Sequence, residues 1–305
     1  MGFAAEAAQQ LRLALPATVT YLFGRSFVSI CLIFIGRMGD LELAAAALAN
    51  TTMNVSGLSV LVGMGTAVST ICGQAYGAKN YRKVGETLQL GLLVFCAPRC
   101  PLPPTPPHRP LTAYCCDAAG AACVPISLLW WNIEGVLLLC GQDPAVSAYA
   151  ARYLRWLIPF LWFVSAQMAL NAFLNAQRAM KPGAVSSVLA CPLHVGVCWV
   201  LFEALRADYA GGAAAMTISG VLQTLLMLGI VKAMGIMKRT WVPWSAGCLD
   251  GWRHFCKLAL AGVISLSEWW ASEIGILLAG ELSTHSPAEL SSSCRPPLLH
   301  LCAGC

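Results

Sequence analysis

The chain has 305 residues, of which 58% are hydrophobic and only 11% charged, with a net charge of +5. This balance excludes an ordinary soluble domain and predicts an integral membrane protein. Its uncharged runs are long enough to cross ~30 Å of hydrocarbon as helices of about 20 residues. They lack the period-2 alternation of a membrane β-barrel, so we predict an all-α, polytopic helix bundle.

Seven membrane-spanning helices are predicted in chain order. They cover residues 13–36, 44–72, 86–141 with an interruption, 153–176, 183–203, 212–235 and 256–282. The first apolar run begins near Leu13 without a basic leader, so no removable signal peptide is expected. Lysine and arginine concentrate in the second, fourth and sixth loops, which places the N-terminus in the cytoplasm. These basic loops explain the positive net charge without a nucleic-acid partner.

Polar groups lie inside the first two predicted spans. Arg25 in the first span can face a cavity or a partner, or it can snorkel along a tilted helix. In the second span, Asn54 can hydrogen-bond as packing glue between helices or can line a cavity. Both pairs of alternatives stay open at this point.

Two segments break the pattern of spans. Residues 98–123 and 283–305 hold ten of the 17 prolines and seven of the 15 cysteines. Proline runs remove backbone donors and break helices, so neither segment can be a lipid-exposed helix. Our hypothesis is that both are non-native and arise from translated intron or a shifted reading frame. Removing 98–123 would join the two halves of the third span into one long helix.

Metal and enzyme sites find little support. Most cysteines of the clean spans, such as Cys31 and Cys198, are isolated in apolar sequence and are interpreted as buried thiols. The cluster Cys115, Cys116 and Cys123 with His108 lacks paired Cys-x-x-Cys spacing, so no metal ligands are predicted. There is no Walker A sequence, and His194 is alone in its span, which is typical of a structural histidine.

Two carboxylates lie in the seventh predicted span. Glu268 and Glu273 are five residues apart and therefore roughly 140° apart around a helix. Lys257 marks the cytoplasmic end, so Glu268 lies about 16 Å inside it. Ionisable groups at this depth usually line a pathway, form a pair or carry a proton. Trp269 and Trp270 lie beside them, where a ring can bind an organic cation or simply pack.

Four stretches together resemble the multidrug and toxic compound extrusion (MATE) transporters of the eukaryotic kind. They are "GRMGDLELAAAALANTTMNVSG", "CGQAYGAKNYRKVGETLQ", "LCGQDPAVSAYAARYLRWLIP" and "KLALAGVISLSEWWASEIG", and their order and spacing match that family. The resemblance covers most of residues 11–97 and 124–282. It implies twelve helices in two six-helix lobes, of which this chain has the N-terminal lobe and the seventh helix.

The resemblance also implies functional residues. Glu268 and Glu273 match the positions that carry proton coupling and cation binding, and Asn54 and Trp269 match further sites of the family. The chain departs from the pattern at Ser272, where animal members typically have tyrosine. It departs again at Tyr21, where a glutamine is often found, and after Leu282 the pattern ends. The cavity-lining candidates are therefore Asn54, Trp269, Arg25 and Tyr21.

The resulting domain organisation has four parts. Residues 11–235 are the N-terminal transmembrane lobe, interrupted at 98–123, and 236–255 are a cytoplasmic inter-lobe linker. Residues 256–282 are the first helix of the C-terminal lobe, and 283–305 are an anomalous tail.

The predicted function is secondary active efflux of multiple drugs, organic cations or metabolites by proton or sodium antiport, with no cofactor and no enzymatic activity. The plasma and vacuolar membranes both fit. Two alternatives stay open: a truncated, non-transporting fragment that pairs with the absent C-terminal lobe or a full-length copy, and a lipid-linked oligosaccharide flippase. An arginine-lined cavity would favour the flippase, and the only candidate is Arg25.

Overall fold

The computed structural model describes residues 3–96, 122–243, 248, 251–266 and 270–271. Every secondary-structure element within these ranges is a helix. The elements are α1 (Phe3–Ile35), α2 (Asp40–Met53), η1 (Asn54–Leu58), α3 (Ser59–Gly77), α4 (Tyr81–Cys96), α6 (Cys123–Trp131), α7 (Ile133–Leu139), α8 (Pro144–Ala176), α9 (Lys181–Trp199), η2 (Val200–Ala204), α10 (Gly211–Ala233), η3 (Ile236–Lys238) and α11 (Trp252–Ser265). The prediction of an all-α bundle is confirmed.

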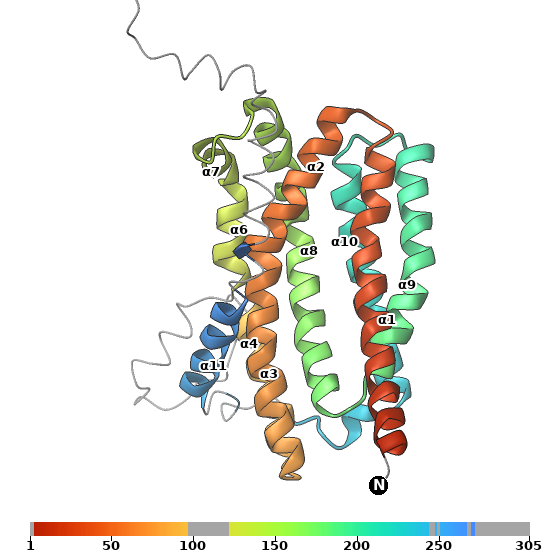
Figure 1. The fold of residues 1–305 in the computed structure, drawn as a ribbon, viewed down its shortest axis with the longest axis vertical. Coiled ribbons are helices and arrows are strands. Elements are labelled where there is room, and N and C mark those ends of the chain that lie inside the picture. Colours follow the sequence, from red (N-terminus) through yellow and green to blue (C-terminus); the bar gives the residue numbers. More distant parts are fainter. Residues whose placement is uncertain (1–2, 97–121, 244–247, 249–250, 267–269, 272–305) are drawn as a thin grey trace, which may run out of the picture.

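The helices form an elongated bundle around α8 (Figure 1). Helix α8 packs against α2, α3, α4, α6, α7 and α10, and it buries residues along most of its 33-residue length. Helices α1, α9 and α10 pack together on one side of it, while α3, α4 and α11 pack on the other. Two groups of helices therefore meet across one central helix.

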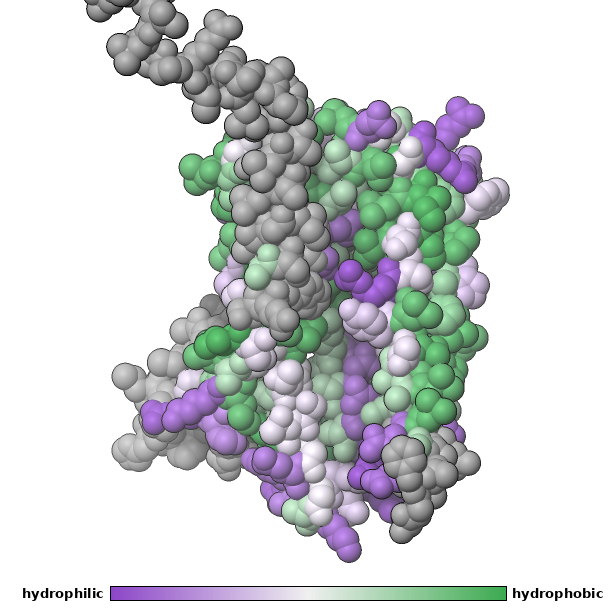
Figure 2. Space-filling view, viewed as in Figure 1, coloured by the Kyte–Doolittle hydropathy of each residue, from purple (hydrophilic) through white to green (hydrophobic). Residues whose placement is uncertain are grey.

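Five of the described helical segments are long and apolar enough to cross a membrane. They are Ala14–Ile35, Asp40–Gly77, Pro144–Ala176, Lys181–Ala204 and Gly211–Ala233. Figure 2 shows hydrophobic side chains over much of the visible face and hydrophilic ones at its two ends, with further hydrophilic groups near its centre. This distribution is the one expected when hydrocarbon covers the middle of the bundle.

Helix α8 begins nine residues earlier than predicted. Asp143 caps it by accepting hydrogen bonds from the backbone N–H groups of Ala145 (2.9 Å) and Val146 (3.1 Å), and Pro144 occupies the first turn. The predicted start at residue 153 was wrong because Arg152 and Arg155 were assigned to the loop before the span. Both arginines lie on the exposed side of the helix, where they pair with Asp208 (3.3 Å) and Glu134 (3.5 Å).

The third span continues across the proline-rich interruption. The backbone N–H of Ala122 donates a 3.0 Å hydrogen bond to the carbonyl of Val94, in the last turn of α4. In an uninterrupted helix that carbonyl accepts from the residue four positions later, which here is Pro98, a residue without an N–H. Ala122 thus takes the helical place of residue 98, and α6 follows directly in the same chain direction.

The seventh predicted helix is docked on the second through backbone-to-backbone contact. A side chain at Gly63 of α3 would meet the Val263 backbone at 2.6 Å, and one at Gly262 of α11 would meet Thr66 and the Gly63 carbonyl. Small residues at such crossings let membrane helices approach closely. This crossing fixes the direction of α11, which ends at Ser265.

A buried histidine ties α1, α9 and α10 together. His194 Nδ1 lies 2.7 Å from the Ser219 hydroxyl, and its Nε2 lies 3.1 Å from the Phe27 carbonyl. The arrangement fits Nε2–H donating to the carbonyl while Nδ1 accepts from Ser219. His194 also stacks on the Phe27 ring at 4.7 Å, and its side chain is fully buried.

Deleting residues 98–121 should preserve the fold, because Ala97 would then be followed directly by the residue that already takes the next helical position. We expect the deletion variant to insert, and its thermal unfolding midpoint in detergent to match or exceed that of the intact chain, since a shorter connection costs less closure entropy. Deleting the 24 residues of the span Lys181–Ala204, which includes α9 and η2, is the length-matched control and should abolish folding. Loss of folded protein for the first variant would contradict helix continuity.

His194→Ala should destabilise the bundle by about 2 kcal/mol, because it leaves the Ser219 hydroxyl and the Phe27 carbonyl without their buried partner. The neighbouring Leu193 is half-exposed and faces away from the core, so Leu193→Ala is the matched control. Thermal unfolding of both purified variants provides the comparison. Equal unfolding midpoints of the two variants would show that the hydrogen bonds of His194 do not specifically stabilise the bundle.

Candidate functional site

A groove runs between the two groups of helices on one side of α8. It consists of two cavities, of 450 Å³ and 400 Å³, that share Thr20, Tyr21, Val62, Met168 and Asn171 in their linings. Because five residues border both cavities, we treat them as one continuous space and call it the groove. Its size falls within the range of small-molecule sites in proteins.

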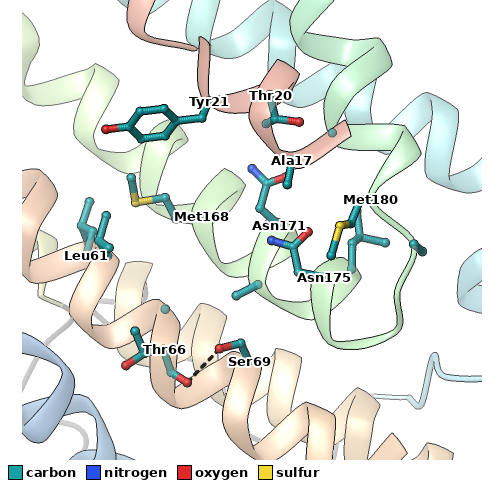
Figure 3. Close-up of a pocket in the computed structure, with 16 residues that line it drawn as sticks. Ala17, Thr20, Tyr21, Leu61, Thr66, Ser69, Met168, Asn171, Asn175 and Met180 are labelled. Atoms are coloured by element: carbon teal, nitrogen blue, oxygen red, sulfur yellow. Dashed lines mark hydrogen bonds between the residues drawn. The ribbon is translucent and has the colours of Figure 1, made fainter. Parts of the chain in front are cut away.

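Three helices form the walls of the groove, as Figure 3 shows for the 400 Å³ cavity. Thr20 and Tyr21 come from α1, Leu61 and Thr66 from α3, and the floor is made by α8. The two asparagines of this floor, Asn171 and Asn175, lie between the other two helices in the view. Most of the lining surface is apolar, with a few polar groups, which is the usual character of a ligand pocket.

The packing around the groove holds its amide groups in place. A side chain at Gly183 of α9 would meet the Asn171 amide oxygen at 2.9 Å, so the glycine leaves room for this amide. On α10, Gln223 donates from Nε2 to the Ser187 hydroxyl at 2.9 Å, which fixes the orientation of its amide. Gln167, one turn before Asn171, is 8% exposed and lines the 450 Å³ cavity.

Arg25 is the one charged residue among those that line the 450 Å³ cavity. It lies about 15 Å from either end of the Ala14–Ile35 span, given a rise of 1.5 Å per residue. Placing a charged side chain at this depth costs roughly 3 kcal/mol on insertion scales. Arg25 is exposed, borders this cavity, and makes no ion pair or hydrogen bond within the described ranges.

The other predicted residues have different placements. Tyr21 lines both cavities and is 68% exposed. Asn54 is buried in η1, a π-helical turn between α2 and α3, and is not among the residues that border the groove. Glu268, Glu273 and Trp269 lie outside the described residues. The functional roles of all five stay predictions.

Sequence reasoning missed the amide floor of the groove. Gln167, Asn171 and Asn175 recur on one face of α8, at spacings of four residues, and Gln223 faces the groove from α10. Their signal was present in the sequence, since amides at helical spacing inside an apolar run are uncommon and usually face other helices or a cavity. The spans of α8 and α10 were assigned from hydropathy, which passes over uncharged amides.

A second polar cluster lies beside the groove, in the core between α1 and α9. The Sγ atoms of Cys31 and Cys198 are 3.8 Å apart, and His194 Nε2 lies 3.5 and 3.6 Å from them. All three could each offer one ligand atom to a metal. The bonds of His194 to Ser219 and Phe27 occupy both ring nitrogens, which favours a structural cluster of buried thiols and histidine.

Comparison with known proteins identifies the family. The MatE family model matches residues 16–101 and 112–200. Protein DETOXIFICATION 11 and Protein DETOXIFICATION 13 of Arabidopsis thaliana are 32% and 33% identical to the chain, each over 92% of it and 53% of its own length. The crystal structure of the eukaryotic MATE transporter AtDTX14 superposes with a TM-score of 0.78 at 27% identity, covering 92% of this chain and 57% of that one.

The chain thus spans about half the length of the relatives it matches, and its all-helical bundle corresponds to roughly half of their fold. The resemblance inferred from four sequence stretches is confirmed, and the family consists of transporters, not enzymes. The chain is an integral, multi-pass membrane protein and belongs to the MATE transporter family.

Proposed function

We propose that the protein to which this chain belongs is a secondary active exporter of small organic molecules, with organic cations as the class implied by the family, in exchange for protons or sodium. One observation carries the proposal: a small-molecule-sized, amide-floored groove lies between the spans of a MATE-family bundle. A structural core packed for stability alone would not keep polar groups facing a cavity at membrane depth.

The groove would form one side of a larger transport site. Family resemblance implies a second six-helix lobe, and alternating access requires one bundle to rock against another around a central site. The walls of the groove come mainly from α1, α3 and α8, and α11 packs against α3. In this proposal α11 leads from the first lobe to the second, so the groove faces the partner lobe.

Glu268 and Glu273 are the proposed coupling groups. They follow the end of α11 at Ser265 by three and eight residues. An ionised carboxylate would attract a cation. Protonation from the acidic side would remove the negative charge of the carboxylate, and the cation would then be released. Deprotonation toward the cytoplasm would restore the cation site. The exchange of one positive charge for another is the physical basis of antiport here.

The orientation and membrane belong to the same proposal. Lys79, Arg178 and Lys238 follow the C-terminal ends of α3, α8 and α10, at the end of the bundle where the N-terminus lies (Figure 1). At the opposite end, arginines are matched by acids, as in the pair Arg37–Glu203 at 3.6 Å. By the positive-inside rule the N-terminus is cytoplasmic. The plasma membrane and the vacuolar membrane are the two proposed locations.

Replacing both glutamates with glutamine should remove coupling, since an amide can neither titrate nor supply a counter-charge. In proteoliposomes of the two-lobe protein to which the chain is proposed to belong, with an imposed pH gradient, we expect tetraethylammonium uptake by Glu268→Gln/Glu273→Gln to fall roughly tenfold or more and to lose its pH dependence. The exposed Glu6 offers a control, Glu6→Gln, which should behave like the unmodified chain.

Three results would contradict the proposal. Unchanged, pH-dependent uptake by the double variant would exclude these glutamates as the coupling groups. Gradient-independent movement of a lipid-linked oligosaccharide would favour the flippase. Correctly folded chain with no uptake, even in the presence of the second lobe, would favour the non-transporting alternative.

Filling the groove should block it without damaging the fold. Gly65 of α3 lines the 400 Å³ cavity, and a side chain there would meet no atom within 4 Å. Gly65→Leu should therefore reduce tetraethylammonium uptake about tenfold at an unchanged unfolding midpoint. Gly229 of α10 is exposed and equally open, so Gly229→Leu is the matched control. Equal uptake by both variants would show that the groove is not on the transport path.

A further inference from the structure

The charge inside the groove is opposite to the one that an organic-cation site needs. Arg25 lines the 450 Å³ cavity near the middle of its span, and the residues that border both cavities include no acidic side chain. A lone guanidinium in surroundings of low polarity repels a cation and attracts an anion. In the described part of the chain, nothing in the groove neutralises it.

Uncharged hydrogen-bonding groups accompany the guanidinium. Gln167 is 92% buried, borders the same cavity, and has no hydrogen-bond partner in the described part of the chain. Asn171 borders both cavities, with its amide oxygen beside the space that Gly183 leaves open. A buried amide without a protein partner is costly unless a bound molecule satisfies it. These two amides can donate to the same anion that pairs with Arg25.

The apolar lining indicates the rest of the ligand. Tyr21, Phe27 and Phe160 contribute aromatic rings to the 450 Å³ cavity, and Met53, Met168 and Met216 contribute thioethers. Aromatic rings favour stacked or edge-to-face contacts with another ring, and methionine sulfur packs well against aromatic groups. A ligand with an aromatic body and one carboxylate would satisfy both the apolar lining and the polar groups.

We propose that Arg25, Gln167 and Asn171 form a subsite for the carboxylate of a small aromatic organic anion, whose ring occupies the apolar part of the groove. Guanidinium and carboxylate match in planar, two-pronged geometry, which an ammonium or an alcohol cannot reproduce. The inference rests on the proposed function in taking the groove as a substrate site. It shifts the expected substrate class from organic cations toward anions, or toward zwitterions bound at their anionic end.

The test measures binding and needs no ion gradient, so its failure is separate from failure of the transport proposal. The full 305-residue chain is placed in phosphatidylcholine nanodiscs, and the Kd is measured for three probes that share a 2-naphthyl ring. These are 2-naphthoate, neutral 2-naphthamide and the cation trimethyl(2-naphthyl)ammonium. We expect 2-naphthoate to bind more tightly than the other two.

Arg25→Gln should raise the Kd of 2-naphthoate roughly tenfold or more and leave that of 2-naphthamide nearly unchanged. Arg25→Lys keeps the positive charge but lacks the planar, two-pronged guanidinium. It should therefore bind 2-naphthoate more tightly than Arg25→Gln and more weakly than the unmodified chain. Arg253→Gln removes an exposed arginine of α11 and is the charge-matched control. Gln167→Met keeps the volume and should weaken 2-naphthoate alone, which preserves the test if Arg25→Gln does not fold.

The outcomes that overturn the inference are distinct. If Arg25→Gln leaves the Kd of 2-naphthoate unchanged, the arginine snorkels or packs instead of binding. If it weakens all three probes equally, its role is structural or it is the counter-ion of a protein carboxylate. Tighter binding of the cation than of 2-naphthoate by the unmodified chain would restore the organic-cation assignment for the groove.

Discussion

Hydrocarbon requires every polar group of the chain to find its partner within the protein, and the structure is organised by how this requirement is met. Backbone groups meet it in long helices, and α8 is the helix on which the others converge. Side-chain polar groups meet it locally where the bundle is closed, as His194 does with Ser219 and Phe27. Arg25, Gln167 and Asn171 do not meet it in this way, and all three border the groove.

Hydropathy and loop charge were sufficient to predict the bundle, because helices of membrane length are nearly the only solution for such a sequence. Hydropathy and loop charge gave a wrong helix boundary where charged residues lie within a membrane-spanning helix. The first turns of α8 carry Arg152 and Arg155, and their pairing with Asp208 and Glu134 could not be read from one-dimensional spacing. The same limit hid the groove, since its walls come from α1, α3 and α8, which are far apart in the chain.

The interrupted third span shows how a bundle can accommodate an added segment. Ala122 bonds to Val94 as if it were residue 98 of one continuous helix. The two ends of the interruption therefore lie one helical step apart, and closing a loop costs little more as its length grows. Packing on both sides stays in register, because Phe95 and Cys123 are both fully buried. The prediction that the two halves form one helix agrees with this geometry.

Glycine separates the packed parts of the bundle from the open one. At Gly63, Gly262 and Gly212 an added side chain would collide with a neighbouring helix, so these glycines permit close packing. At Gly24 and Gly65 it would meet nothing within 4 Å, and both residues line the groove. Glycine lowers helix stability by about 1 kcal/mol relative to alanine, and at these two positions no contact offsets that cost. The open space they border, together with a charge and amides that face it, is what a binding site requires and a packed core does not.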